Sequence, residues 1–255
     1  MSKKVNIITI IVVALVIAGW YFNVASLYYI IPISILYLII NIFGSANIKL
    51  NYFFHSHCNA TTGKKEIALT FDDGPHPVIT PLLLELLNKH NITATFFCTG
   101  KNAENNPDIV SKITTNGHII GNHSYGHSKF FDLLSTRKMQ KEISRTNEMI
   151  SSITGKTPLL FRPPYGVTNP MLRKAISKSK LISIGWSLRS FDTVKNSQKV
   201  LNKLLSNTMP GDIVLFHDTN AQIITIIEDY LLWLQKNDYK IVSLTSLLNI
   251  PAYEE

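Results

Sequence analysis

Adjacent carboxylates are the first feature of this sequence that suggests chemistry. Asp72 and Asp73 stand side by side in the run Thr70-Phe-Asp-Asp-Gly-Pro. One carboxylate of such a pair could bind a cation while its unligated neighbour serves as a base. Asp-Gly is also a common turn signal, and a simple turn is the favoured interpretation of this run taken alone.

Two histidines follow with a spacing that suits a metal ion. His123 and His127 would share one face of a helical turn and could bind a single metal. Ser124 stands where the metalloprotease motif His-Glu-x-x-His has its glutamate, so a base must come from elsewhere, and Asp72 is a candidate. Unrelated surface histidines explain this pair equally well when it is taken by itself.

Three further clusters carry groups that suit catalysis. Arg162 opens the proline-stiffened run Arg-Pro-Pro-Tyr-Gly, which could hold a carboxylate and offer N–H groups of its Tyr-Gly backbone to an oxyanion, although a rigid surface loop is favoured for this run alone. Trp186 could line a sugar site, and Asp192 could orient a catalytic imidazole. His217 directly follows the apolar run Ile-Val-Leu-Phe, which favours a catalytic position over a loop.

Other polar residues receive ordinary interpretations. A solvated loop position stays open for Asp218, and Cys98 is predicted to be a buried small hydrophobe. Cys58 and Cys98 are too few for a disulfide framework or a cysteine metal site. The histidines that we interpret as loop or edge residues are His55, His57, His76, His90 and His118.

Short apolar runs alternate with amphipathic stretches beyond residue 65. The predicted strands are Ile67–Phe71, Ala94–Cys98, His118–Gly121, Leu159–Phe161, Leu181–Trp186, Asp212–Phe216 and Lys240–Leu244. The predicted helices are Thr80–Asn88, Asp108–Thr115, Ser135–Ile153, Asn169–Ser179, Ser197–Asn207 and Gln222–Lys236. This alternation predicts βαβ units with a parallel sheet, in which catalytic groups gather at the carboxyl ends of strands. All five clusters fall at such ends, which favours a shared site over five separate loops.

Two apolar stretches precede this alternation. Val5–Phe22 and Leu27–Phe43 are each near the lower limit of about 17–25 residues for a membrane-spanning helix. A cleaved signal peptide is less favoured, because the apolar character resumes after Asn23–Ser26. Lysines on both flanks fit a hairpin with both ends in the cytoplasm. One long span plus an interfacial piece would instead place the rest of the chain outside, and the sequence leaves this orientation open.

The net charge of the chain limits the kinds of binding partner that we expect. The formal net charge is +8 and the sequence pI is about 9.4, which suits attraction to an anionic lipid or polymer. The basic residues are scattered, and the sequence holds no dense basic tract and no nucleic-acid motif. We therefore expect no nucleic-acid partner, and no protein partner is indicated.

Taken in order, the motifs are similar to those of a known family. Thr70-Phe-Asp-Asp-Gly-Pro, His123-x3-His127, Arg162-Pro-Pro-Tyr-Gly, Trp186 through Asp192 and Leu215-Phe-His-Asp resemble the polysaccharide deacetylases of carbohydrate esterase family 4, which share the nodulation-type deacetylase homology domain. The resemblance implies an α/β fold, a distorted (β/α)7–8 barrel. It also implies removal of N-acetyl groups from amino-sugar polymers or glycolipids, peptidoglycan-like or chitin-like. The implied cofactor is a divalent metal, commonly Zn²⁺, with Co²⁺, Mn²⁺ or Ni²⁺ as alternatives.

The resemblance also implies residue roles. It implies that Asp73, His123 and His127 bind the metal, that Asp72 is the catalytic base, and that His217 is the general acid. Arg162 would hold Asp72, and Asp192 would be the partner of His217. Tyr165 would offer its backbone N–H to the oxyanion, and Trp186 and Leu215 would form the pocket for the acetyl methyl group. One position departs from the family pattern: Thr193 stands where the fourth motif usually has tryptophan after its aspartate. This departure affects the substrate-facing wall more than the metal site.

The resulting expectation is a chain of three parts. Residues 1–45 would form a membrane anchor of one or two apolar helices, 46–65 a linker, and 66–255 the catalytic domain. The partners would be an N-acetylated glycan and, through the N-terminal segment, the lipid of a bacterial inner membrane. Two alternatives remain: a deacylase of the same fold acting on O-acetyl, formyl or non-sugar amide groups, and a non-catalytic carbohydrate-binding membrane protein.

Overall fold

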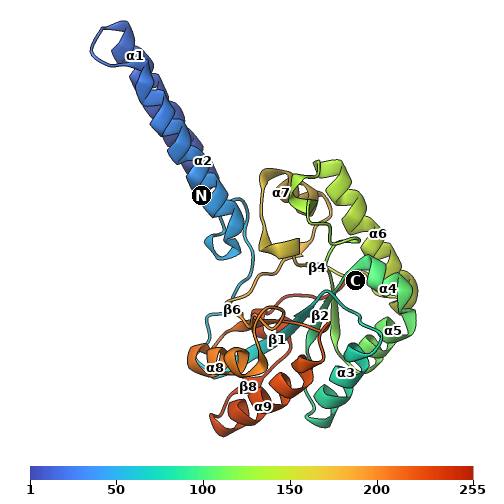
Figure 1. Cartoon of the computed structure of the whole chain (residues 1–255). Coiled ribbons are helices and arrows are strands. Elements are labelled where there is room, and N and C mark those ends of the chain that lie inside the picture. The colour runs from blue at the N-terminus through green and yellow to red at the C-terminus, as the bar shows by residue number, and fades with distance from the viewer. Residues whose placement is uncertain (255) are drawn as a thin grey trace.

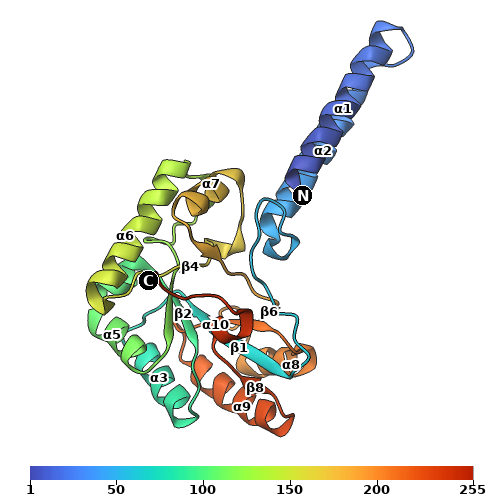
Figure 2. The same cartoon turned by 180° about the vertical axis from the view of Figure 1, so that it is seen from behind.

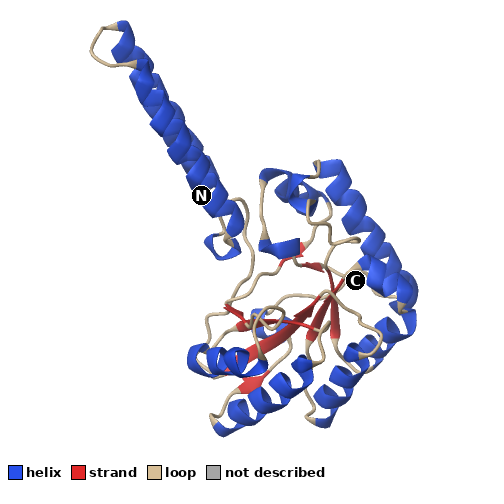
Figure 3. Cartoon of the chain, viewed as in Figure 1, coloured by secondary structure: helices blue, strands red, loops and turns tan. Residues whose placement is uncertain are grey.

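A curled, wholly parallel sheet forms the centre of the computed structural model, which describes residues 1–254 (Figures 1 and 3). Its strands are β1 (Glu66–Asp72), β2 (Thr95–Cys98), β3 (Ile119–Asn122), β4 (Leu160–Phe161), β5 (Ile182–Ser183), β6 (Leu188–Arg189), β7 (Ile213–His217) and β8 (Lys240–Ile241). They lie in the order β5-β4-β3-β2-β1-β7-β6, and β8 pairs with the start of β1. The predicted distorted (β/α) barrel is confirmed.

Helices cover the outer face of this sheet (Figure 3). They are α3 (Ile79–Lys89), α4 (Gly100–Asn105), α5 (Pro107–Thr115), α6 (Thr136–Thr154), α7 (Pro170–Lys178), α8 (Ser197–Asn207) and α9 (Gln222–Lys236). The short helix α10 (Leu244–Leu248) packs on the other face, where Leu244 joins a cluster with Ala68, Phe97 and Ile213. The six predicted helices are all present. Helix α4 escaped prediction because its sequence, Gly-Lys-Asn-Ala-Glu-Asn, has no apolar stripe; Thr99 caps it by accepting a hydrogen bond from the Asn102 N–H.

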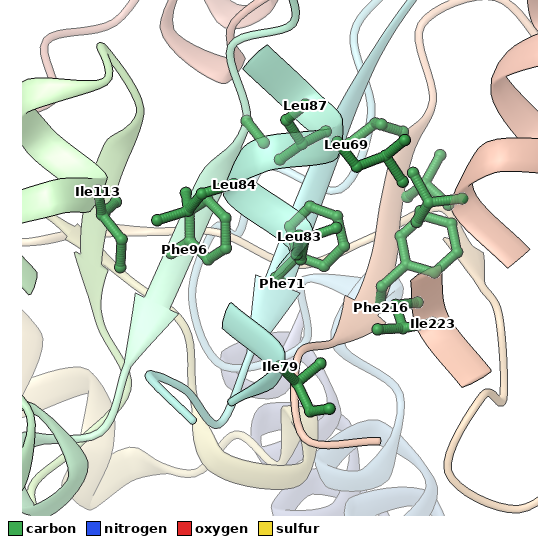
Figure 4. Packing of buried hydrophobic residues seen from close by; sticks show 14 of the residues in the cluster. Leu69, Phe71, Ile79, Leu83, Leu84, Leu87, Phe96, Ile113, Phe216 and Ile223 are labelled. Atoms are coloured by element: carbon green, nitrogen blue, oxygen red, sulfur yellow. The ribbon is translucent and has the colours of Figure 1, made fainter. Parts of the chain in front are cut away.

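A row of aromatic rings sets the register of the central strands. Phe71 on β1 lies between Phe96 on β2 and Phe216 on β7, with ring centroids 5.2 and 5.6 Å away. Figure 4 shows these rings beneath Leu83 and Leu87 of α3. Because successive side chains of a strand point to opposite faces, a buried Phe71 turns Asp72 toward the other face of the sheet. The same register places Asp72 beside His217.

The two N-terminal apolar stretches form an antiparallel hairpin that projects away from the barrel (Figures 1 and 2). Helix α1 spans Ser2–Tyr21, and α2 spans Ile30–Ala46 after a 3₁₀ turn at Leu27–Tyr29. Both are long and apolar enough to cross a membrane by length and composition, and their side chains are almost wholly exposed. The structure thus folds the two apolar helices against each other, while the number of membrane spans and the orientation stay predictions.

The base of the hairpin is bonded to the barrel. The Thr168 N–H donates to the Ser45 carbonyl at 2.9 Å, and the Ser45 hydroxyl donates back to the Thr168 carbonyl at 2.6 Å. Further along, His57 forms a β-bridge to Ile184 and Asn59 forms one to Asp212. The segment 46–65, expected to be a linker, therefore lies against the barrel, and the proposed division into parts stays a prediction.

Candidate active site

Three predicted metal ligands converge at the carboxyl ends of β1 and β3. One potential ligand atom from each of Asp73, His123 and His127 lies within 4.8 Å of the others. Oδ1 of Asp73 is 3.5 Å from Nε2 of His123 and 3.4 Å from Nε2 of His127. Within residues 1–254, this Oδ1 is buried and has no hydrogen-bond partner. A buried carboxylate oxygen facing two imidazole nitrogens is a suitable donor set for a divalent metal such as zinc.

The two histidines meet through a tight turn and not through the helical turn considered from the sequence. Ser124 and His127 have φ values of +63° and +44°, which no α-helix contains. The Asn122 side chain accepts a 2.9 Å hydrogen bond from the Ser124 N–H, and such local bonds compete with helix formation. The spacing thus brings the two rings together by another geometry.

The orientation of His123 suits a ligand. Its Nδ1 lies 2.8 Å from the carbonyl oxygen of Arg162, so the proton belongs on Nδ1 and the lone pair of Nε2 faces Asp73. Burial lowers the pKa of His123 to about 3, with the charge of His127 acting in the same direction. A neutral imidazole is the form that binds metals.

Asp72 lies beside this cluster and is held from behind. Nη1 of Arg162 donates to Oδ1 of Asp72 at 2.7 Å, while Oδ2 lies 3.7 Å from Nε2 of His123. The fully buried guanidinium also donates to Thr70 Oγ1 and to the Gly185 carbonyl, each at 2.8 Å. Burial raises the pKa of Asp72, and the opposing charges of Arg162 and His217 do not cancel that effect.

His217 faces the same cavity and is paired with Asp192. Its Nδ1 lies 3.0 Å from Oδ1 of Asp192, whose Oδ2 accepts the His217 backbone N–H at 2.8 Å. Ser190 donates a third hydrogen bond to Asp192, at 2.6 Å. Burial by itself lowers the pKa of His217, but the hydrogen bond and charge of Asp192 outweigh it, so that pKa is raised above its ordinary value. The imidazole therefore stays protonated to higher pH than a free histidine.

A cavity of about 300 Å³ connects these groups. Its walls include Asp72, Asp73, His123, His127, Tyr165, Trp186, Thr193, Leu215 and His217. Arg162 and Asp192 stand behind the wall, where each contacts one predicted catalytic group. The structure thus brings together all ten residues singled out from the sequence, while their individual roles stay predictions.

A strained loop forms one wall. Tyr165 has a φ of +58°, which costs a non-glycine residue on the order of 1–3 kcal/mol. The next residue, Gly166, also has a positive φ, and an added Cβ there would lie 2.4 Å from the Trp186 ring. Only glycine allows the indole to close this side of the cavity. Within residues 1–254 the Tyr165 N–H makes no hydrogen bond, so it is available to a ligand.

The family model described as polysaccharide deacetylase matches residues 59–182. The peptidoglycan-N-acetylmuramic acid deacetylase of Bacillus subtilis is 33% identical over 195 residues, covering 73% of each chain. The chain belongs to the polysaccharide deacetylase family. The resemblance inferred from its motifs is confirmed.

Two further members resemble the chain in sequence or structure. A peptidoglycan-N-acetylglucosamine deacetylase of Bacillus cereus is 37% identical over 157 residues, which cover 61% of this chain. The chain spans about half of that relative's length, 57%. The crystal structure of the Bc1960 peptidoglycan N-acetylglucosamine deacetylase matches with a TM-score of 0.73 and 30% identity, covering 78% of this chain and 95% of the other.

As a polysaccharide deacetylase family member, the chain contains one cavity residue that the sequence did not reveal. Arg189 lies on β6, a two-residue strand too short to show a period, and lines the cavity beside Trp186. The guanidinium of Arg189 is 5.9 Å from the Trp186 ring and 4.9 Å from the Phe191 ring. The only signal in the sequence was its place between Trp186 and Asp192, which were both singled out.

The structure excludes one alternative that the sequence left open, and it contradicts one interpretation. Asp218 is fully buried, not a solvated loop residue; it accepts a hydrogen bond from the Thr80 hydroxyl. Burial raises the pKa of Asp218 to about 7. His118 is also buried, and its Nδ1 accepts the Ala94 N–H at 3.2 Å. Burial lowers the pKa of His118 to about 4, so it is a neutral core residue of this deacetylase fold, not a loop or edge residue.

Proposed function

We propose that this chain is a metal-dependent hydrolase that removes N-acetyl groups from N-acetylated amino sugars in glycan polymers or glycolipids. The observation that carries the proposal is the position of Asp72. This carboxylate stands next to the Asp73–His123–His127 cluster and across a shared cavity from His217. The named activities of the relatives, deacetylation of peptidoglycan sugars, support the same chemistry.

Asp73, His123 and His127 would hold the metal, with zinc as the first choice and Co²⁺, Mn²⁺ or Ni²⁺ as alternatives. A divalent metal in this position supplies Lewis acidity toward water and the acetamide carbonyl. Three protein ligands leave room for both. The hydrogen bond from His123 Nδ1 to the Arg162 carbonyl fixes the orientation of the imidazole, so that Nε2 would point toward the bound metal.

Asp72 would receive the proton of the attacking water. Its Oδ1 is engaged by Arg162, which leaves Oδ2 toward the cavity. The Tyr165 N–H would donate to the oxygen that becomes negative when the carbonyl carbon is attacked. Because the Asp72 carboxylate and the Tyr165 N–H are already positioned without substrate, these groups would need little reorganisation in the transition state.

His217 would protonate the departing amine. Its raised pKa keeps the imidazolium available near neutral pH, and Asp192 fixes the ring through Nδ1. The C–N bond breaks as the amine takes this proton, giving acetate and a free amino sugar. Trp186 and Leu215 would enclose the acetyl methyl group.

We further propose that the hairpin anchors the chain in a bacterial inner membrane. Lys3 and Lys4 lie at the same end of the hairpin as Lys49, because the Ser2 N–H donates to the Tyr52 carbonyl at 3.0 Å. The opposite turn, Phe22–Ser26, carries no charged residue. Since positive charge is retained on the cytoplasmic side, this pattern puts the catalytic unit on the cytoplasmic face of the cell envelope.

Acetate release tests the proposed reaction. The full chain in detergent is given N-acetylglucosamine tetramer or peptidoglycan, with zinc or with a chelator. We expect acetate with zinc, loss of release with chelator, and recovery when Zn²⁺ or Co²⁺ is restored. Formylated and O-acetylated sugars run in parallel test the same-fold deacylase alternative. Binding of the tetramer without acetate under every metal would instead favour the non-catalytic alternative.

A further inference from the structure

A second, larger cavity lies directly beside the catalytic one. It encloses about 730 Å³ and shares Trp186 and Arg189 with the catalytic cavity. Its remaining walls come from Ala46–Lys49 at the end of α2, from Ser187 and Leu188, and from α8. The cavity therefore connects the place where the hairpin ends to the place where the acetyl group would be cleaved.

Positive charge is concentrated around this second cavity. Lys49, Arg189 and Lys203 line it, and Lys195 lies close by. Three of these cations lie close to the ring of Phe191. Nζ of Lys203 is 4.6 Å from the ring centroid, and Nζ of Lys195 and the Arg189 guanidinium are each 4.9 Å from it. Burial and the charges of the other three cations lower the pKa of Lys203. Like charges held this close favour an anion between them.

No protein carboxylate neutralises these cations within residues 1–254. None of the four forms a salt bridge there, and Nε of Arg189 is buried without a hydrogen-bond partner. Asp212 also lines the cavity, but it forms no salt bridge with these cations; its two oxygens accept hydrogen bonds from Ser187 Oγ at 2.6 Å and from the Met209 N–H at 2.7 Å. Its single negative charge faces three lining cations, of which Lys49 donates one hydrogen bond to the Ser187 carbonyl. A bound phosphate would accept from their remaining N–H groups, because guanidinium and ammonium groups bind phosphate well.

An apolar groove continues from the basic cavity along α2. It encloses about 430 Å³, shares Ala46 with the basic cavity, and is lined by Leu38, Ile42, Phe53 and Val167 among others. Leu38 lies two turns before the end of α2, so the groove extends roughly 12 Å up the helix. In a membrane-inserted hairpin, this groove would open toward acyl chains.

The neighbouring loops are apolar as well. Phe130 and Leu133 are 67% and 74% exposed, and Met171 beside them is also exposed. The two segments are joined by hydrogen bonds from Asn169 to the Asp132 carbonyl and from Thr136 to the Met171 carbonyl. Asp132 lines the groove along α2, so these apolar side chains flank the hairpin base. Exposed apolar residues in this position suit contact with a bilayer surface.

Building on the proposed deacetylase function, we propose that the substrate is an N-acetylated amino sugar joined through phosphate to a membrane lipid. The sugar occupies the catalytic cavity, the phosphate lies between Lys49, Arg189 and Lys203, and the first part of the lipid chain follows the groove on α2. This order of sugar, phosphate and lipid matches the order of the three cavities from the barrel toward the hairpin.

The test compares three acetylated substrates with the full chain in lipid vesicles: N-acetylglucosamine joined by diphosphate to a short polyprenyl chain, the soluble UDP-linked sugar, and the neutral N-acetylglucosamine tetramer. We expect kcat/KM for the lipid-linked sugar to exceed that of the tetramer at least tenfold. Equal turnover of the lipid-linked sugar and the tetramer would overturn the phosphate site while leaving the deacetylase function intact. Equal turnover of the UDP-linked and lipid-linked sugars would overturn the assignment to a lipid.

Absence of acetate from all three substrates would instead contradict the deacetylase function, and the inference with it.

A matched pair of variants distinguishes a specific phosphate site from a general effect of the protein's positive charge. Lys203→Gln should lower the preference for the lipid-linked sugar over the tetramer at least tenfold, and Lys203→Arg should restore most of it. Lys236→Gln removes the same charge at the exposed end of α9 and should leave the preference unchanged. An unchanged preference in Lys203→Gln would contradict the proposal.

Discussion

Nη1 of Arg162 donates a 2.7 Å hydrogen bond to Oδ1 of Asp72 although the two residues stand 90 positions apart. The bond uses one carboxylate oxygen and leaves the other toward His123. The pair thus separates two functions within one side chain: one oxygen fixes its direction, and the other can receive a proton.

Substitution of Asp72 should separate chemistry from metal binding. Asp72→Asn keeps the shape and the hydrogen bond from Arg162 but removes the base, so we expect kcat to fall about 10²–10⁴-fold. Zinc affinity, measured by calorimetry, should stay close to that of the wild type. His123→Ala should lose both activity and zinc binding. Normal turnover by Asp72→Asn would contradict the assignment of the base.

The pairing of His217 with Asp192 predicts a change in pH dependence. The acid must be protonated to act, and Asp192 raises its pKa. In Asp192→Asn the charge is gone, the pKa of His217 falls, and the alkaline limb of kcat/KM should move to lower pH. A pH–rate profile on the N-acetylglucosamine tetramer checks this. An alkaline limb that does not move would show that another group limits the rate there.

Asp218 should make stability depend on pH. Its pKa is raised to about 7 in the folded protein, against an ordinary 3.8, so the folded state binds more protons between these values. Its cost to stability is therefore absent below about pH 4 and complete above about pH 7. We expect Asp218→Asn to raise the Tm by about 2–4 °C or more at pH 8 and by less at pH 5. Thermal unfolding in the presence of chelator measures both values, and an equal gain at both pH values would contradict a titrating Asp218.

The proposed membrane insertion of the hairpin predicts opposite accessibility for two introduced thiols. Both native cysteines are buried, so Val24→Cys in the hairpin turn and Thr61→Cys in the segment before β1 each supply an accessible thiol. An impermeant maleimide should label Val24→Cys in right-side-out vesicles and Thr61→Cys in inside-out vesicles. The reverse pattern would place the catalytic unit outside. Labelling of both positions from one side would contradict the hairpin.

The sequence predicted the strands before Asp72 and His217 well because each is a local pattern, whereas the predicted strands Leu181–Trp186 and Lys240–Leu244 ran three residues past the observed β5 and β8. The run Ile-Val-Leu-Phe before His217 and the run before Asp72 are apolar segments whose burial needs no knowledge of distant residues. The motif resemblance then supplied the pairing of Arg162 with Asp72 and of Asp192 with His217.

The remaining features depend on contacts that no local pattern encodes. Asp218 is buried by Thr80, 138 positions away, and by the backbone of Gly74, where an added Cβ would lie 2.1 Å from its carboxylate. The turn at His123–His127 departs from a helix because Asn122 caps it. The basic cavity combines Lys49 with Arg189 and Lys203, which lie about 140 positions or more further along the chain, so the sequence did not show the cluster.

The reciprocal hydrogen bonds between Ser45 and Thr168 have a mechanical consequence. A catalytic unit on a long loose tether sweeps a volume and can work along a polymer at varied heights. Here the bonds between Ser45 and Thr168 tie the base of the hairpin directly to the barrel. If the hairpin spans a membrane as proposed, this attachment would hold the catalytic cavity at one distance from the bilayer, and encounters would depend on the lateral diffusion of substrates that present their acetyl group at that distance.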